Sequence, residues 1–178
     1  MKATKLLLIM LSCMLVIGCK KDKTEEEPTP PTPQYPTISM DSLKNYFPYK
    51  TGDQIYFRGW GGNVIYTINK ATFESEGNKI YINITMDGDY NYGDAEYLVE
   101  MKVEVTDRKT LRATFYECIV YSGEHRFPTE GDYFYDTSKS GDLPEMFTFT
   151  NGAIIKKGTG LSYYLDADSR PWTFIMRK

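Results

Sequence analysis

The side chains best suited to nucleophilic or metal chemistry are few in this sequence of 178 residues. His125 is the only histidine, and it follows Gly123 and Glu124 in a polar stretch. A zinc site needs several His, Cys or carboxylate ligands, and a Cys–His nucleophile needs an exposed thiolate beside an orienting group. Cys118 lies instead in a strand-like stretch of aromatic and aliphatic residues, which favours a small buried side chain. We therefore expect no metal site and no thiol catalysis, with His125 in an exposed loop.

The segment Asp87–Asp94 has the composition of a calcium-binding loop but not its pattern. An EF-hand loop that began at Asp87 would need glycine at its sixth position and glutamate at its twelfth. Those positions hold Tyr92 and Leu98, and strand-like patterns flank the segment. Because Asp, Asn and Gly favour turns through local hydrogen bonds, the sequence predicts a turn here and no bound calcium.

Acidic side chains are numerous, with 24 Asp and Glu in the chain. Two carboxylates about 5 to 9.5 Å apart could hydrolyse a glycosidic bond, but spacing along the chain does not predict such a distance. Most of the acids fall in turns or at the polar positions of alternating strands, where solvation accounts for them. We therefore expect no enzymatic activity and no cofactor, and we keep a hydrolase with a carboxylate pair as an alternative.

Aromatic side chains in predicted loops are the residues that most favour ligand binding. Trp60 stands in a glycine-rich turn between two predicted strands, and Tyr90 and Tyr92 stand in a later polar turn. Exposed aromatic planes often mark binding surfaces, and sugar rings stack on them. We expect Trp60, Tyr90 and Tyr92 to form a ligand-binding surface; the alternative for Trp60 is that its ring folds back over the end of the domain. We expect Trp172, which follows a proline and opens the last strand, to lie in the core.

The first nineteen residues have the features of a bacterial export signal. Lys2 and Lys5 give a positive start, and residues 6–17 form an apolar stretch too short for a membrane-spanning helix of about 20 residues. The stretch ends in Val16-Ile17-Gly18-Cys19, which resembles the lipobox of bacterial lipoprotein signal peptides. This resemblance implies cleavage before Cys19 and lipidation of its thiol and new amine, and each buried acyl methylene contributes about 0.8 kcal/mol to membrane attachment. An ordinary signal peptide with an incidental cysteine is the alternative.

A charged and then proline-rich segment follows the predicted lipidation site. Lys20–Glu27 begins with lysines and ends in glutamates, which is similar to the signal that sends some Gram-negative lipoproteins to the outer face of the outer membrane. Residues 28–36 are rich in proline and favour extended polyproline II. We therefore expect residues 1–18 to be a signal peptide, residues 19–38 to be the lipidated cysteine and its tether, and residues 39–178 to form a single domain.

The predicted domain is all-β. Period-two alternation over residues 80–86 places isoleucines and a methionine on one face and polar residues on the other, as in an antiparallel sheet with one wet face. A helical turn over Ser39–Tyr46 precedes the strands, and Asn151-Gly152 predicts a hairpin. Further strands are predicted at residues 54–58, 64–73, 97–105, 111–121, 132–136, 146–150, 153–156, 161–165 and 172–177.

Roughly eight to ten strands with short connections predict an antiparallel meander that curls or closes to protect its edges. We expect a strongly curved sheet or a lipocalin-like barrel; a two-sheet β-sandwich is the alternative, because both architectures give this alternation. A barrel with an apolar interior cavity would indicate a small lipophilic ligand. A filled core would leave the loops and the outer faces for binding.

Charge and cysteine content exclude two further features. The formal net charge is −3, and no run of Lys and Arg with interleaved aromatics occurs, so we exclude nucleic-acid binding, which draws most of its affinity from neutralised phosphates. The cysteines are Cys13, Cys19 and Cys118. Because Cys13 lies in the predicted signal peptide and Cys19 would carry lipid, the mature chain is expected to form no internal disulfide.

The lipobox, the tether and the domain opening Tyr46–Asp53 together resemble small surface lipoproteins of Gram-negative bacteria that carry β-rich domains. The resemblance implies a lipid-anchored protein of the outer membrane, exposed at the cell surface, with the periplasmic face as the alternative. It implies no activity. We expect a non-catalytic binding module for a carbohydrate or another ligand on the envelope side. An accessory component of an envelope protein complex is the alternative, beside the hydrolase named above.

Overall fold

The structure is a computed structural model that describes residues 35–59, 62–90, 95–121, 124–166 and 169–178. Residues 34–178 form one compact unit, whose described part holds ten strands and two short helices. In chain order the elements are α2 (Met40–Lys44), β1 (Gln54–Gly59), β2 (Gly62–Glu76), β3 (Lys79–Tyr90), β4 (Ala95–Thr106), β5 (Thr110–Tyr121), β6 (Glu124–Asp136), α3 (Thr137–Ser140), β7 (Met146–Thr148), β8 (Ile154–Lys156), β9 (Gly160–Leu165) and β10 (Pro171–Arg177).

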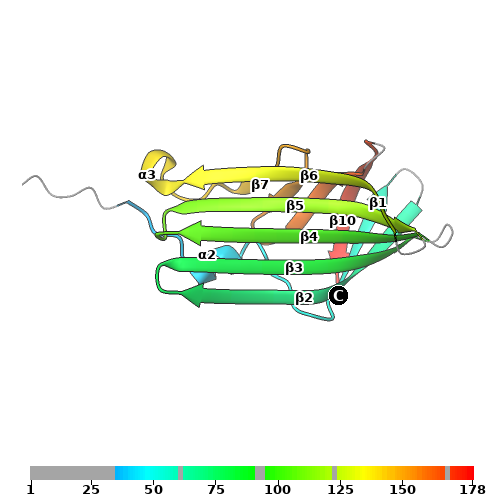
Figure 1. Cartoon of the computed structure of the whole chain (residues 1–178), viewed down its shortest axis with the longest axis horizontal. Coiled ribbons are helices and arrows are strands. Elements are labelled where there is room, and N and C mark those ends of the chain that lie inside the picture. Colours follow the sequence, from blue (N-terminus) through cyan, green and yellow to red (C-terminus); the bar gives the residue numbers. More distant parts are fainter. Residues whose placement is uncertain (1–34, 60–61, 91–94, 122–123, 167–168) are drawn as a thin grey trace, which may run out of the picture. The chain divides into compact units, whose positions relative to one another are not determined.

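All ten strands belong to one antiparallel sheet with the order β6-β5-β4-β3-β2-β1-β10-β9-β8-β7 (Figure 1). The edge strands β6 and β7 approach each other, because the N–H of Thr150 donates to the carbonyl of Asp132 at 3.1 Å and the N–H of Asp132 donates to Oγ1 of Thr150 at 2.9 Å. The sheet is therefore a nearly closed barrel. This confirms the all-β meander and the lipocalin-like barrel predicted from the sequence, rather than the two-sheet sandwich.

A glycine allows the two edges to meet. A Cβ added to Gly131 of β6 would lie 2.2 Å from Oδ1 of Asn151 and 2.9 Å from its backbone nitrogen, so only glycine fits this close approach. Along the same seam the ring of Tyr133 stacks on Phe147 of β7 with centroids 4.8 Å apart. Backbone contact and ring stacking thus hold the seam of the barrel together.

Alternate residues of the strands face inward and form one hydrophobic core. On β4, for example, Val99, Met101, Val103 and Val105 are at most 3% exposed. Aromatic rings fill the space between opposite walls: the Phe115 ring of β5 packs against the Tyr164 ring of β9 with centroids 6.1 Å apart. Because side chains fill the interior, the described part of the domain offers its loops and outer faces, rather than a large central cavity, for contact with a ligand.

The short helix α2 opens the domain, inside the helical turn predicted over Ser39–Tyr46. Ser39 caps it: the hydroxyl of Ser39 accepts from the N–H of Ser42 at 3.0 Å, and that of Ser42 accepts from the N–H of Ser39 at 3.1 Å. The apolar face of α2 and the turn after it are anchored in the core by Leu43 and Phe47, both fully buried.

The chain enters the domain at the end of the barrel that carries α2 and α3 (Figure 1). There the N–H of Ile38 donates to the carbonyl of Arg108 in the β4–β5 turn at 2.7 Å, and the Ile38 side chain is 2% exposed. Ile38 therefore belongs to the hydrophobic core of the compact unit. The connections β1–β2, β3–β4 and β5–β6 leave from the opposite end, which we call the loop end.

All ten strands occur where the alternation predicts them, and Asn151-Gly152 joins β7 to β8 with Gly152 at a φ of 86°. The largest difference is β6, which begins at Glu124 rather than at Asp132. Its register shifts opposite Glu117–Ile119, and Phe127 in the shifted part has a φ of 53°. This irregularity, typical of a bulge, hides the alternation. The loop position predicted for His125 is therefore wrong: His125 pairs with Val120 within β6, although it is exposed as expected.

Candidate functional site

The loop end brings together the strand ends that flank the predicted ligand-binding residues. Val64 near the start of β2 pairs with Tyr90 at the end of β3, and Gly59 pairs with Gly62 across the β1–β2 connection. Trp60 and Tyr92 themselves, and the side chain of Tyr90, lie outside the described residues. The binding surface of Trp60, Tyr90 and Tyr92 thus stays a prediction. The strand ends that flank these residues are neighbours in the sheet.

A layer of polar side chains lies inside the barrel toward this end. We call it the polar layer; it consists of Tyr66 (β2), Glu117 (β5), Tyr164 (β9) and Asp166, directly after β9. Glu117 and both tyrosines are 0% exposed and Asp166 is 5% exposed. Buried carboxyl groups are uncommon and usually need partners, so this layer is the most unusual feature of the core.

Hydrogen bonds hold three of the four polar-layer side chains firmly. The hydroxyls of Tyr66 and Tyr164 are 2.7 Å apart and share one hydrogen bond. Asp166 accepts from Nε1 of Trp172 at 3.0 Å through one carboxyl oxygen and from the N–H of Arg170 at 2.9 Å through the other. Burial raises the pKa of both tyrosine hydroxyls well above the ordinary value, so they stay neutral and act as hydrogen-bonding groups.

Glu117 is held less well than its neighbours. Its Oε2 accepts a long hydrogen bond of 3.3 Å from the hydroxyl of Thr129, and among the described residues its buried Oε1 has no partner. Burial, reinforced by the charge of Asp166, raises the pKa of Glu117 from 4.5 to about 8. The side chain is therefore mostly protonated at neutral pH, because an ionised carboxylate in this site would lack solvation.

Two glycines make room for the large rings around the polar layer. A Cβ on Gly59 would lie 2.5 Å from the Trp172 ring, and a Cβ on Gly88 would lie 2.5 Å from the Tyr66 ring. Trp172 also stacks on Tyr164 with a centroid distance of 6.2 Å and an interplanar angle of 9°. The rings therefore lie against bare backbone, and their positions set the geometry of the hydroxyls and of Asp166.

A protonated carboxyl beside a second carboxyl group is the arrangement that general acid catalysis uses. However, the described grooves of the domain are lined by neither Glu117 nor Asp166. Both carboxyl groups sit below packed aromatic rings rather than at the floor of one of those grooves. Glu117 is thus a buried carboxyl whose pKa is raised, as a general acid requires, but neither it nor Asp166 lines a described groove through which a substrate could reach it.

Neither Glu117 nor Asp166 is among the residues that the sequence predicts to bind a ligand. A signal for Glu117 was present: Leu111, Ala113 and Phe115 alternate inward along β5, and the next inward position is Glu117. A charged residue at an inward position of a strand is a site to examine. Asp166 had no such signal, because its burial depends on the loop that returns to Arg170 and Trp172.

Cys118 and Trp172 both lie at buried positions, as the sequence predicts. Cys118 is buried as predicted, but on the opposite face of β5 from Phe115 and Glu117, in hydrogen-bonding contact with Tyr116. Burial raises the pKa of its thiol, which disfavours a thiolate nucleophile. The part of the chain that the structure describes holds no group of three or more His, Cys, Asp or Glu able to bind a metal. Trp172 is 2% exposed, which confirms its predicted core position.

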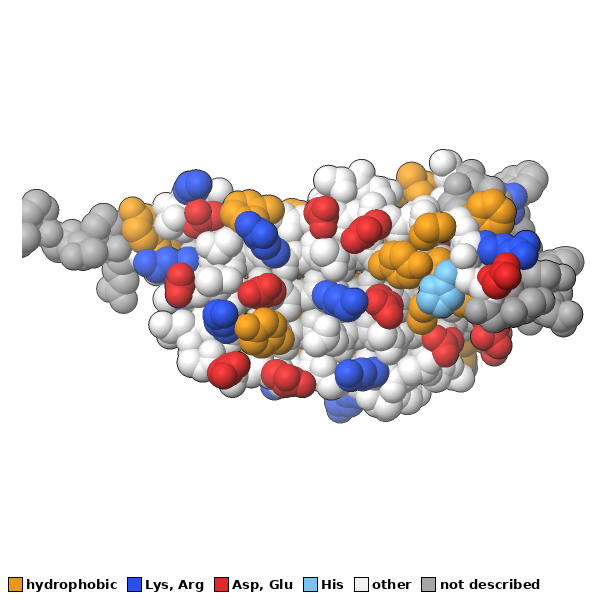
Figure 2. Space-filling view, in the orientation of Figure 1, with side chains coloured by type: hydrophobic (Ala, Val, Ile, Leu, Met, Phe, Trp, Pro, Cys, Tyr) orange, Lys and Arg blue, Asp and Glu red, His pale blue; other side chains and the backbone are white. Residues whose placement is uncertain are grey.

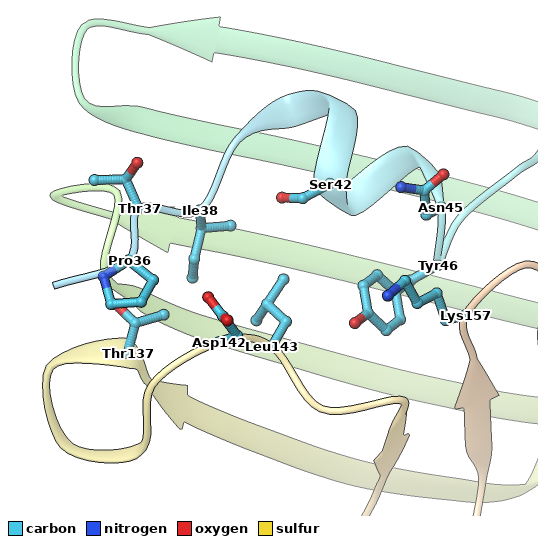
Figure 3. A pocket seen from close by; sticks show the side chains of 10 residues that line it. All are labelled: Pro36, Thr37, Ile38, Ser42, Asn45, Tyr46, Thr137, Asp142, Leu143 and Lys157. Atoms are coloured by element: carbon cyan, nitrogen blue, oxygen red, sulfur yellow. The ribbon is translucent and has the colours of Figure 1, made fainter.

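The outer face of the front strands is mixed in charge. Figure 2 shows acidic and basic side chains interspersed over it, with hydrophobic side chains gathered beside the single histidine. A small groove of about 280 Å³ lies at the end where the chain enters, between Ile38, Ser42 of α2 and Leu143 (Figure 3). Ligand pockets usually measure about 300 to 1,000 Å³, so this groove is at the lower limit.

Comparison of the chain with family models, curated proteins and solved structures gives no match. Within the described residues, no helix has the length and apolar character needed to cross a membrane. The site must therefore be interpreted from its own geometry.

Proposed function

We propose that this protein is a lipid-anchored surface lipoprotein of the outer membrane whose barrel is a non-catalytic binding module. In this proposal Cys19 carries the lipid and the residues after it form the tether. The loop end, with Trp60, Tyr90 and Tyr92, binds a carbohydrate or another ligand on the envelope side.

The observation that supports it most is the position where the chain enters the barrel. Ile38 is fixed to the β4–β5 turn by its hydrogen bond to Arg108, at the end of the barrel opposite the loop end. A tether joined there leaves the loop end free. The filled core supports the same proposal, because it directs ligand contact to loops and outer faces.

Lipidation is tested with palmitate labelling of the full chain in a Gram-negative host. We expect the wild type to take up labelled palmitate and to lose its first 18 residues. A Cys19→Ser variant is expected to take up no label and to keep its signal peptide, because the reaction needs the thiol of residue 19. The matched control is Cys13→Ser, which keeps the lipobox and should be labelled normally. Equal labelling of Cys19→Ser and wild type would contradict the lipid anchor.

Ligand binding is tested on a glycan array with the chain starting at Lys20, which keeps the whole compact unit. We expect the wild-type protein to bind a glycan. Trp60→Ala should raise the dissociation constant for that glycan by about tenfold or more, because a stacked aromatic contact contributes about 1.4 kcal/mol. Phe134→Ala is the control, because Phe134 is an exposed ring of β6, 55% exposed, away from the loop end.

Two results would argue against this function. One is the absence of any bound glycan or other soluble ligand; the other is a Trp60→Ala variant that binds as tightly as wild type. Crosslinking in cells that captures one membrane protein, together with an empty array, would favour the accessory component of an envelope complex instead.

A further inference from the structure

A second surface, separate from the loop end, has the composition of a binding site. A groove of about 610 Å³ lies between the turn after α2 and the second half of β2, well inside the size range of ligand pockets of about 300 to 1,000 Å³. We call it the basic groove; the residues that matter to its chemistry are Lys44, Pro48, Lys50, Ala71, Phe73 and Arg177.

The groove exists because β2 is longer than β1. Strand β1 pairs with β2 only over Gly62–Thr67, while β3 pairs with β2 as far as Glu76. The register of β2 against β3 shifts at Asn69, and the inward-facing Ala71 and Phe73 lie beyond Thr67, the last residue of β2 that pairs with β1. The turn after α2 packs over only some of this part of β2, and the groove lies between them.

The rim of the groove is basic. Lys44, Lys50 and Arg177 line it and no acidic residue does, in a chain whose net charge is −3. The ion pairs found among the described residues involve other lysines and arginines. The carboxylate of Asp53 is near, and it accepts a hydrogen bond from the backbone N–H of Lys50 at 3.0 Å. Both lysines are exposed, so their ammonium groups can reach an incoming anion.

The floor of the groove is apolar. Phe73, Ala71 and Pro48 line it and are each half-buried. The ammonium group of Lys44 lies 6.0 Å from the centroid of the Phe73 ring, which places positive charge directly beside apolar surface. A ligand that fits must therefore combine an anionic head with an apolar body.

The walls of the groove are fixed before any ligand arrives. The guanidinium of Arg177 donates to the carbonyl of Pro48, and the N–H of Ala71 donates to the hydroxyl of Thr51 at 3.3 Å. Tyr49, which is 3% exposed, accepts a hydrogen bond from the N–H of Leu161. A preformed site loses less entropy on binding than a flexible one.

From this combination we propose that the basic groove binds a free single-chain amphiphilic carboxylate, such as a fatty acid. The carboxylate lies between Lys44, Lys50 and Arg177, and the first part of the acyl chain lies on Phe73 and Pro48. This site is on the side of the barrel, near the end where the chain enters, and it is independent of a ligand at the loop end.

Isothermal titration calorimetry of the chain that starts at Lys20, with dodecanoate below its critical micelle concentration, tests the proposal. We expect saturable binding of one molecule to wild type, and a dissociation constant raised about tenfold or more in Lys44→Gln/Lys50→Gln, since charge-assisted hydrogen bonds to a carboxylate are lost. The matched control is Lys79→Gln/Lys156→Gln, which removes the same charge from exposed sites outside the groove and should bind as wild type. Ala71→Leu, which fills the floor, should also weaken binding.

The proposal is overturned if dodecanoate does not saturate on wild type, if both double variants weaken binding equally, or if Ala71→Leu binds unchanged. Dodecyl maltoside binding as tightly as dodecanoate would also overturn it, because the basic rim would then play no part. Binding to vesicles of anionic phospholipid without binding of monomeric dodecanoate would show that a membrane surface, not a free acid, is the ligand.

Discussion

Replacing Glu117 with glutamine is expected to remove most of the loss of stability that the wild type undergoes between pH 4.5 and pH 8. In the unfolded chain this carboxyl group titrates near 4.5, and in the folded chain burial and the charge of Asp166 raise its pKa to about 8. Between these values the unfolded chain has released its proton while the folded chain retains it. The contribution of Glu117 to the free energy of unfolding is therefore fully present below pH 4.5. It falls as the pH rises, until the folded carboxyl also ionises near pH 8.

The expected size of this effect is large for a single side chain. One proton retained over about three pH units, at about 1.4 kcal/mol per unit, lowers the free energy of unfolding by about 4 kcal/mol at pH 8. The glutamine amide has nearly the same shape as the carboxyl group and does not ionise, so Glu117→Gln should be several times less sensitive to pH. Urea denaturation at pH 5, 6, 7 and 8, on the chain that starts at Lys20, measures the difference between variant and wild type.

The matched control is Glu130→Gln, because Glu130 is an exposed acid on β6, one residue after the Thr129 that binds Glu117. It should change the pH dependence of unfolding little. Wild type and Glu117→Gln with the same pH dependence would mean that Glu117 is solvated or paired in solution, and the polar layer would then not be a buried acid site.

The barrel could be predicted from the sequence because its strands alternate so regularly. Residues 80–86 have only one face that can be buried, so their register and their neighbours follow from that pattern. The alternation failed at β6, where the shifted register near Phe127 breaks it and where His125 was assigned to a loop. Closure was expected in general terms, but the contact of Gly131 with Asn151 depends on two segments meeting in space, which no local pattern records.

The proposed binding surfaces are harder to predict from the sequence than the fold. Trp60, Tyr90 and Tyr92 were chosen because loops with exposed aromatics often bind ligands, a rule that uses local sequence alone. The basic groove combines Lys44, Ala71 and Arg177 from three distant parts of the chain. The polar layer likewise joins β5 to the loop after β9. Sites that depend on such long-range contacts become visible only when the barrel is closed.

Removing the ring of Trp172 is expected to be the most destabilising single change in the core. Its side chain is 2% exposed, stacks on Tyr164, packs edge-on against Tyr97 with centroids 6.4 Å apart and donates to Asp166. Trp172→Ala should lower the free energy of unfolding by about 3 to 5 kcal/mol, because a large cavity forms and a buried carboxyl group loses a donor. Urea denaturation of the chain that starts at Lys20, at pH 7, measures this loss.

Two further variants separate the causes of that loss. Trp172→Phe keeps most of the packing and removes the donated N–H, so it should recover part of the stability and leave a deficit of about 1 to 3 kcal/mol for the buried carboxyl group. Thr173→Ala, at the exposed neighbouring position of β10, should change stability by less than about 0.5 kcal/mol. If Trp172→Ala unfolds with the same free energy as Thr173→Ala, the packing of the Trp172 ring does not stabilise the core. If Trp172→Phe is no more stable than Trp172→Ala, the hydrogen bond to Asp166 rather than the packed ring holds the polar layer in place.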